Sequence, residues 1–157
     1  MDLKNRLISY EGSIAYQIKV GYFKNGKFWT YKDSLGYPTI GYGRLLKAGE
    51  SYPNGITPEQ AERMLEEDIS TAKSAVCSLE LDLPADWQDF MIIMVFQLGL
   101  SGTLKFRKMI QALRDKKYKE AIVQAKDSLW YRQTKSRVDQ MIALKLKTLI
   151  PFVVVLI

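Results

Sequence analysis

Residues 31–43 read YKDSLGYPTIGYG, with β-forming residues on either side of a turn that runs from Asp33 to Gly36. Upstream of this stretch, aromatic and β-branched residues are dense, and Asn25-Gly26 among them is a strong signal for a type I′ hairpin. We therefore predict strands across residues 16–43, arranged as a three-stranded antiparallel meander with two turns.

A short helix is predicted before the strands, over residues 2–10. Asp2 is a good N-cap, and apolar side chains recur behind it at helical spacing. Gly12 is expected to end this helix, because glycine readily adopts the backbone conformation of a C-terminal cap. Glu11 is thereby placed at the C-terminal end of the helix, where the strands begin.

The chain after residue 57 has helical periodicity. Thr57, Pro58 and Gln60 form the pattern of a capping box, and the helix that they start is predicted to reach about residue 79. A fully apolar run over 90–96 predicts a buried central helix, which Gly99 and Gly102 are expected to end. Further helices are predicted near 104–115, 118–128 and 135–149, with Trp130-Tyr131 in a junction.

This order of elements predicts an α+β fold: one helix, a small sheet, a long helix and then a helical bundle. We expect a single domain over 1–157. It consists of a β lobe over about 13–56, a linking helix over about 58–79, and a helical lobe over about 80–150 that also includes the helix at 2–11. A cleft between sheet and bundle is plausible in such an arrangement.

The bulk composition excludes several kinds of chemistry. The chain has no histidine, which removes histidine bases and His-ligated zinc, and Cys77 is its only cysteine, which removes an internal disulfide. Carboxylates are then the natural proton carriers near neutral pH, provided that burial raises the pKa of the donor. The net charge of +6 favours polyanionic partners such as nucleic acid, anionic lipid or the bacterial wall, although many soluble proteins are mildly basic. Lys and Arg are spread along the chain, which argues against sequence-specific DNA binding.

Glu11 and Asp33 stand out among the 17 acidic residues. Glu11 lies where the predicted helix gives way to the strands, and Asp33 lies in a turn between two predicted strands. Asp33 is also a favoured turn residue, and Glu11 could be an ion-pair partner at a helix end. Composition and spacing alone do not decide between these structural roles and a catalytic role for the two residues.

Five stretches of the chain carry a resemblance that favours the catalytic reading. They are 11–12, 31–43, 55–68, 94–99 and 127–134. In this order they resemble the phage lysozymes of the T4 type (glycoside hydrolase family 24), including the lysozyme domains of tail baseplate proteins and phage endolysins. The similarity extends to about residue 148 and implies a lysozyme-like α+β fold.

The resemblance implies a catalytic site made of Glu11, Asp33 and Thr39. Glu11 would protonate the leaving glycosidic oxygen. Asp33 would stabilise the oxocarbenium-like transition state or hold the attacking water, and Thr39 would position that water. Such chemistry needs one protonated and one ionised carboxyl on opposite sides of the bond. The resemblance also implies inversion at the anomeric carbon, with the longer carboxyl separation of inverting enzymes, and hydrolysis instead of anhydro-sugar formation.

Further site residues follow from the same resemblance. Arg137 would pair with Glu11, or else be a surface cation of the last helix. Trp130 is expected to pack in the interior instead of serving as a sugar platform. The substrate-binding residues implied are Leu45, Phe96, Gln97, Thr134 and Arg137.

The chain departs from the family pattern in three places. Asp33 follows Glu11 by 22 positions, which is much farther than in the shorter members. The extra hairpin would extend the cleft rim through Tyr22, Phe28 or Trp29, or would be purely structural. Arg44 stands where the family has histidine, and we predict that it contacts Asp68 as a structural ion pair. The apolar tail over 149–157 could pack across the lobes, or if exposed be prone to aggregation or touch a membrane.

The expected function is hydrolysis of bacterial peptidoglycan between N-acetylmuramic acid and N-acetylglucosamine by a monomer. No metal, organic cofactor, nucleic acid partner or stable membrane insertion is expected. No signal peptide is visible, so an endolysin would wait in the host cytoplasm until the membrane is breached, and a place in the virion tail is the alternative. A wall-binding module without turnover and a cationic membrane-disrupting protein are the competing hypotheses. Release of reducing ends and dye leakage from vesicles separate the three.

Overall fold

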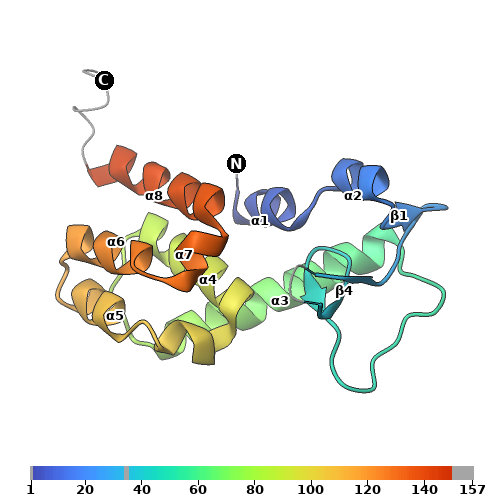
Figure 1. Cartoon of the computed structure of the whole chain (residues 1–157). Coiled ribbons are helices and arrows are strands. Elements are labelled where there is room, and N and C mark those ends of the chain that lie inside the picture. The colour runs from blue at the N-terminus through green and yellow to red at the C-terminus, as the bar shows by residue number, and fades with distance from the viewer. Residues whose placement is uncertain (1, 34–35, 150–157) are drawn as a thin grey trace. The chain divides into compact units, whose positions relative to one another are not determined.

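The computed structural model describes residues 2–33 and 36–149, and side chains as far as residue 143. The chain forms two compact units, with the boundary between Thr71 and Ala72 inside the long helix α3 (Pro58–Ser78). The α+β class predicted from the sequence is confirmed, since helices predominate beside small antiparallel sheets (Figure 1). The predicted lobe boundaries, with the helix at 2–11 joined to the later helices, stay a prediction.

The first unit begins with two helices that cap residues delimit. In α1 (Leu3–Glu11), the Asp2 side chain accepts a hydrogen bond from the Asn5 amide, and Gly12 ends the helix, both as predicted. The next helix, α2 (Ile14–Val20), corrects the prediction of strands from residue 16. Ser13 accepts from the Tyr16 amide and Gly21 adopts the left-handed conformation, so local caps outweigh the β propensity of this segment.

The strands form two sheets instead of one meander over 16–43. Strands β1 (Phe23–Lys24) and β2 (Lys27–Phe28) pair as a hairpin. Its turn residues Asn25 and Gly26 have φ values of 54° and 71°, as the predicted type I′ turn requires. The second sheet has the order β3 (Tyr31–Lys32), β4 (Pro38–Ile40), β5 (Arg44–Leu45), and its last strand lies beyond the predicted limit.

The core of the first unit joins the hairpin to the segment just before α3. Phe28 is fully buried, and its backbone exchanges two 2.9 Å hydrogen bonds with Ile56. The predicted capping box starts α3: the Thr57 amide donates to Gln60 Oε1 at 2.8 Å, and the Gln60 amide donates to Thr57 Oγ1 at 3.2 Å. Ala61 and Leu65 continue the buried stripe of the helix.

The second unit is helical. Its elements after α3 are α4 (Ala85–Leu104), α5 (Arg107–Arg114), α6 (Tyr118–Lys126), α7 (Leu129–Gln133) and α8 (Lys135–Leu149). Most of the apolar run in α4 is buried, as predicted. Gly99 leaves helical geometry (φ 71°, ψ 169°) and divides α4 at a kink, so the first helical segment ends there as predicted, whereas Gly102 lies within the second segment, which continues to Leu104.

Trp130 and Tyr131, predicted in a junction, lie within the short helix α7. Among the described residues no single helix is long and apolar enough to cross a membrane. Only α4 and α5 taken together, bent by 102°, reach that length and composition. The apolar tail beyond Leu149 lies outside the described residues, as do Ser34 and Leu35 of the predicted turn.

Candidate active site

Glu11 is the last residue of α1, and its carboxyl group is pressed against the backbone of Gly43. A Cβ atom built on Gly43 would lie 2.6 Å from Glu11 Oε2 and 2.9 Å from its Cδ. Gly43 belongs to the turn between β4 and β5 and has a φ of 79°. A side chain at position 43 would displace the Glu11 carboxyl, so the glycine allows the carboxyl to lie against this turn.

Asp33 follows β3 and organises the turn that leads to β4. Its amide donates to the Tyr37 carbonyl at 2.9 Å, and its Oδ1 accepts from the Tyr37 amide at 2.9 Å. The turn-forming role of Asp33 is therefore real. It leaves a chemical role open, because a carboxylate can accept several hydrogen bonds at once.

Thr39 lies on β4 and is only 2% exposed. Its hydroxyl donates to the Tyr37 carbonyl at 3.0 Å. Since a hydroxyl has a single hydrogen, Oγ1 keeps its lone pairs to accept from another group. Asp33 and Thr39 are thus both held by the backbone of Tyr37.

Tyr31 is a site residue that the sequence analysis missed. Burial is the largest cause, and together with the negative charge of Glu11 and the smaller effects of Tyr22 and Asp33 it raises the pKa of Tyr31 to about 12. The ring of Tyr31 stacks on that of Tyr22 with centroids 4.2 Å apart. Its phenol therefore stays neutral within reach of the fields of both carboxylates. The available signal was the spacing of two residues between Tyr31 and Asp33 in a stretch predicted as strand, which places both side chains on one face.

Arg44 forms an ion pair with Glu67, the residue before Asp68, with Arg44 Nη1 3.5 Å from Glu67 Oε2. The predicted contact between Arg44 and Asp68 stays a prediction. The side chains of an α-helix diverge by about 100° per residue, and α3 turns Glu67 toward Arg44. Burial raises the pKa of Asp68, and the charge of Arg44 only partly opposes this effect.

The inserted hairpin supplies both core and surface. Phe28 is fully buried, which corrects its expected place on a substrate-facing rim. Trp29 donates from Nε1 to the Lys24 carbonyl at 2.9 Å and lines a pocket of about 360 Å³ with Tyr52 and Glu50. Leu45, an expected substrate contact, is 52% exposed on β5.

The remaining predicted site residues lie in the second unit. Gln97 Oε1 accepts from Trp130 Nε1 at 2.9 Å, and Thr134 Oγ1 donates to the Trp130 carbonyl at 2.6 Å. Trp130 itself is 6% exposed and meets Phe90 edge-on, so its predicted packing role is confirmed. Phe96 on α4 and Arg137 on α8 are half-buried.

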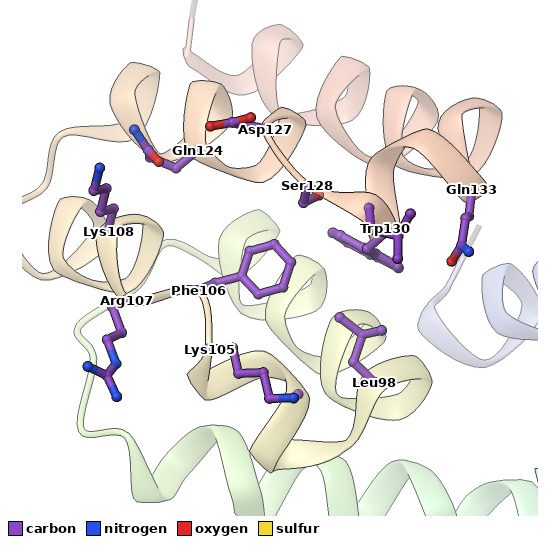
Figure 2. Close-up of a pocket in the computed structure, with 12 residues that line it drawn as sticks. Leu98, Lys105, Phe106, Arg107, Lys108, Gln124, Asp127, Ser128, Trp130 and Gln133 are labelled. Atoms are coloured by element: carbon purple, nitrogen blue, oxygen red, sulfur yellow. The ribbon is translucent and has the colours of Figure 1, made fainter.

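A pocket of about 600 Å³ adjoins Trp130 within the second unit. Figure 2 shows Phe106 projecting into this pocket toward Trp130, and the two rings meet edge-on at 6.1 Å. Cationic side chains gather along one side, and amide and hydroxyl groups along the other (Figure 2). The cations are Lys105, Arg107 and Lys108, with Asp127 as the acidic residue in the lining. We call this the cationic pocket.

Known proteins resemble this chain over between about half and three quarters of its length. The chain is 30% identical over 138 residues to the pre-baseplate central spike protein Gp5 of Enterobacteria phage T4, which covers 71% of this chain but 24% of that protein. It is 28% identical over 149 residues to the probable T4-type lysozyme 1 of Dictyostelium discoideum, covering 78% of this chain and 88% of that protein. The endolysin of Salmonella phage P22 is 36% identical over 76 residues, or 46% of this chain and 52% of the endolysin.

A family model described as phage lysozyme matches residues 23–145. The match begins after Glu11, and it includes Asp33, Thr39 and the cationic pocket. The family and the lysozyme-like fold implied by the resemblance are thereby confirmed. The chain belongs to the phage lysozyme family.

Proposed function

We propose that the chain hydrolyses the glycan strands of bacterial peptidoglycan, at the β-1,4 bond between N-acetylmuramic acid and N-acetylglucosamine. The observation that carries this proposal is the grouping in one folded unit of two carboxyl groups around Tyr31, with Glu11 pressed on Gly43. Membership of the phage lysozyme family supports the same class of reaction.

In the proposed reaction Glu11 donates a proton to the glycosidic oxygen as the bond from C1 to that oxygen breaks. Ionised Asp33 stabilises the oxocarbenium-like transition state and receives a proton from the attacking water, whose oxygen bonds to C1 from the opposite face. Thr39 accepts a hydrogen bond from that water, because its own hydrogen is already donated to Tyr37. The products are a new reducing end with inverted configuration and a free hydroxyl.

Residues of the second unit are also proposed to bind the glycan. Phe96, Gln97, Thr134 and Arg137 would contact sugars there, as Leu45 would in the first unit. Gln97 suits this role because its Nε2 group has no hydrogen-bond partner among the described residues and can donate to a sugar or an amide. The ion pair of Arg44 would support the fold nearby, without a chemical role.

The cationic pocket is proposed to attract anionic groups of the cell wall. Lys105, Arg107 and Lys108 are exposed, and they concentrate part of the net charge of +6 at one place. Attraction between exposed charges acts over about 10 Å at ordinary salt, so it would favour adsorption to the wall and weaken as salt rises.

Two biological settings fit this activity. Relatives include a phage endolysin and a central spike protein of a phage baseplate. We propose that the chain acts in host lysis or in phage entry, as a monomer that needs no cofactor, no nucleic acid and no stable insertion into a membrane. The chain spans about a quarter of the length of the spike protein, in which the matched region is one part of a larger molecule.

The test is release of reducing ends from purified peptidoglycan by the parent protein and by Glu11→Gln. This substitution keeps the shape of the side chain and removes the transferable proton, so the rate should fall at least about 100-fold. Glu59→Gln, which neutralises an exposed carboxylate in the first turn of α3, is the matched control and should keep the parent rate.

Absence of reducing ends with the parent protein would overturn hydrolysis. Sedimentation with cell walls would then support the alternative of a wall-binding module. Equal rates for the parent and Glu11→Gln would instead remove Glu11 from the chemistry and leave the hydrolysis to other groups.

A further inference from the structure

Gln17 lies in the segment that lengthens the spacing between Glu11 and Asp33, on the seven-residue helix α2. Most of the side chains of α2 are exposed, but Gln17 is only 1% exposed. Burying a side-chain amide, which has two donor hydrogens and two acceptor lone pairs, costs free energy of folding unless the amide makes hydrogen bonds in the folded chain. The contacts of Gln17 therefore indicate what this inserted helix does.

The Gln17 amide joins two pieces of backbone that lie far apart in the sequence. Its Nε2 donates to the Gly12 carbonyl and to the Gly41 carbonyl, each at 2.9 Å. Both partners are carbonyl oxygens, which can only accept, so the orientation of the amide follows from its neighbours. Both amide hydrogens are used, and Oε1 is buried without a hydrogen-bond partner in the part of the chain that the structure describes.

Both carbonyls belong to the frame around Glu11. Gly12 follows Glu11 directly and ends α1. Gly41 opens the turn that leads to Gly43, against which the Glu11 carboxyl is pressed. One side chain thus ties the end of the helix that carries the carboxyl to the turn that the carboxyl touches.

The packing around Gly12 strengthens this link. A Cβ atom on Gly12 would lie 3.6 Å from Gln17 Cγ and 3.7 Å from its Nε2, so the glycine backbone rests directly on the Gln17 side chain. Because water is excluded from these hydrogen bonds, they are stronger and harder to exchange than bonds on the surface. The link resists both separation and sliding of the two backbone segments.

We propose that Gln17 is a positioning residue for Glu11. Helix α2 then serves to hold Gln17 against the two backbone segments that surround Glu11. The inference rests on the proposed function in so far as Glu11 is the proton donor. Loss of the link would let α1 and the β4–β5 turn shift relative to each other. A misplacement of about 1 Å at a reacting group can lower a rate by about 100-fold.

The test uses the full chain with Gln17→Met, which keeps length and burial but cannot donate to carbonyls. Gln111→Met is the matched control, because Gln111 is an exposed glutamine on α5 whose Nε2 donates to the nearby side chain of Asp115. Soluble glycan fragments serve as substrate, so that kcat and KM are separable. We expect kcat to fall at least about tenfold with KM nearly unchanged for Gln17→Met. The control should keep both constants.

A readout that needs no turnover separates this inference from the proposed function. The titration of the Glu11 carboxyl carbon is followed by NMR in the parent, in Gln17→Met and in the control. We expect the titration curve to move in Gln17→Met and to stay in place in the control. If the parent releases no reducing ends but the curve moves, the proposed hydrolysis fails and the positioning role stands.

A parent-like kcat and a parent-like titration in folded Gln17→Met would overturn the positioning role. If Gln17→Met does not fold, Gln17→Asn replaces it, because the shorter amide can reach at most one of the two carbonyls. The kcat of Gln17→Asn should then lie below that of the parent without being abolished, again with KM unchanged. Full parent kcat in Gln17→Asn would equally overturn the inference.

Discussion

The Glu11 carboxyl group and the Gly43 backbone are in such close contact that any side chain at position 43 would overlap the carboxyl. A Cβ atom at this position would lie 2.6 Å from Glu11 Oε2. The backbone of Gly43 also has a φ of 79°, which other residues rarely adopt. Position 43 therefore requires glycine for two independent reasons, the close contact with Glu11 and the positive φ. Substitutions at two glycines can distinguish the effects of these two reasons.

Gly43→Ala is expected to lower the rate of reducing-end release by about 100-fold, because the new methyl group must displace the Glu11 carboxyl. Gly49→Ala is the control, since Gly49 has a similar φ of 86° but nothing within 4 Å of its Cβ position. Both variants should lose about 1–2 kcal/mol of stability from backbone strain, and only Gly43→Ala should lose activity. Equal activities would contradict the contact.

Thr39→Val is expected to reduce kcat at least about tenfold, because the attacking water loses the acceptor that orients it. The lost hydrogen bond to the Tyr37 carbonyl should cost about 1 kcal/mol of stability. Thr39→Ser keeps the hydroxyl and should retain most of the activity. Steady-state rates and thermal unfolding check both points, and an active Thr39→Val would remove this residue from the mechanism.

Phe28→Ala is expected to lower the free energy of unfolding by about 3–5 kcal/mol. The ring is fully buried and meets Phe23 and Tyr42 edge-on, with centroids 4.8 Å and 5.1 Å away. Val123→Ala, at a 56% exposed position of α6, should change stability by less than about 0.5 kcal/mol. Denaturant titration measures both. A small change in the free energy of unfolding for Phe28→Ala would mean that the hairpin contributes little to the core.

Asp68→Asn is expected to raise the melting temperature at neutral pH and to leave it unchanged in strong acid. Burial raises the pKa of Asp68 in the folded chain, so the unfolded chain ionises first as the pH rises. Folding then loses stability from the ordinary carboxyl pKa up to the raised one. The amide does not titrate, so the variant avoids this loss.

The control for this comparison is Asp82→Asn, whose carboxylate is 92% exposed beside Lys116 and should show no such gain. Melting curves across the acid range decide the matter. A lower melting temperature of Asp68→Asn at neutral pH would mean that attraction to Arg44 outweighs burial.

Arg107→Gln combined with Lys108→Gln is expected to weaken adsorption to purified cell walls several-fold and to flatten its dependence on salt. The double variant Lys73→Gln and Lys119→Gln removes the same charge from exposed positions outside the cationic pocket. Sedimentation at increasing salt compares the two. Equal losses would show that total charge matters and that the pocket does not.

The sequence by itself predicted those features that depend on hydrogen bonds or backbone conformation within a few neighbouring residues. Asp2 caps α1, Thr57 and Gln60 close their box, and Asn25-Gly26 turns the hairpin, because each of these features depends on hydrogen bonds or φ values within a few residues. The helix at α2 followed from the same kind of signal, in Ser13 and Gly21. In this segment β-forming residues lie between the two caps, so propensity and capping predict different structures, and the caps prevail.

The family motifs predicted a triad of Glu11, Asp33 and Thr39, but they could not predict how these residues are held. Glu67 pairs with Arg44, Tyr31 lies in the field of two carboxylates, and Gln17 joins Gly12 to Gly41. Each of these contacts joins segments that are distant along the chain. Local patterns of propensity and capping carry no information about such distances, which arise only when the helices and strands pack together.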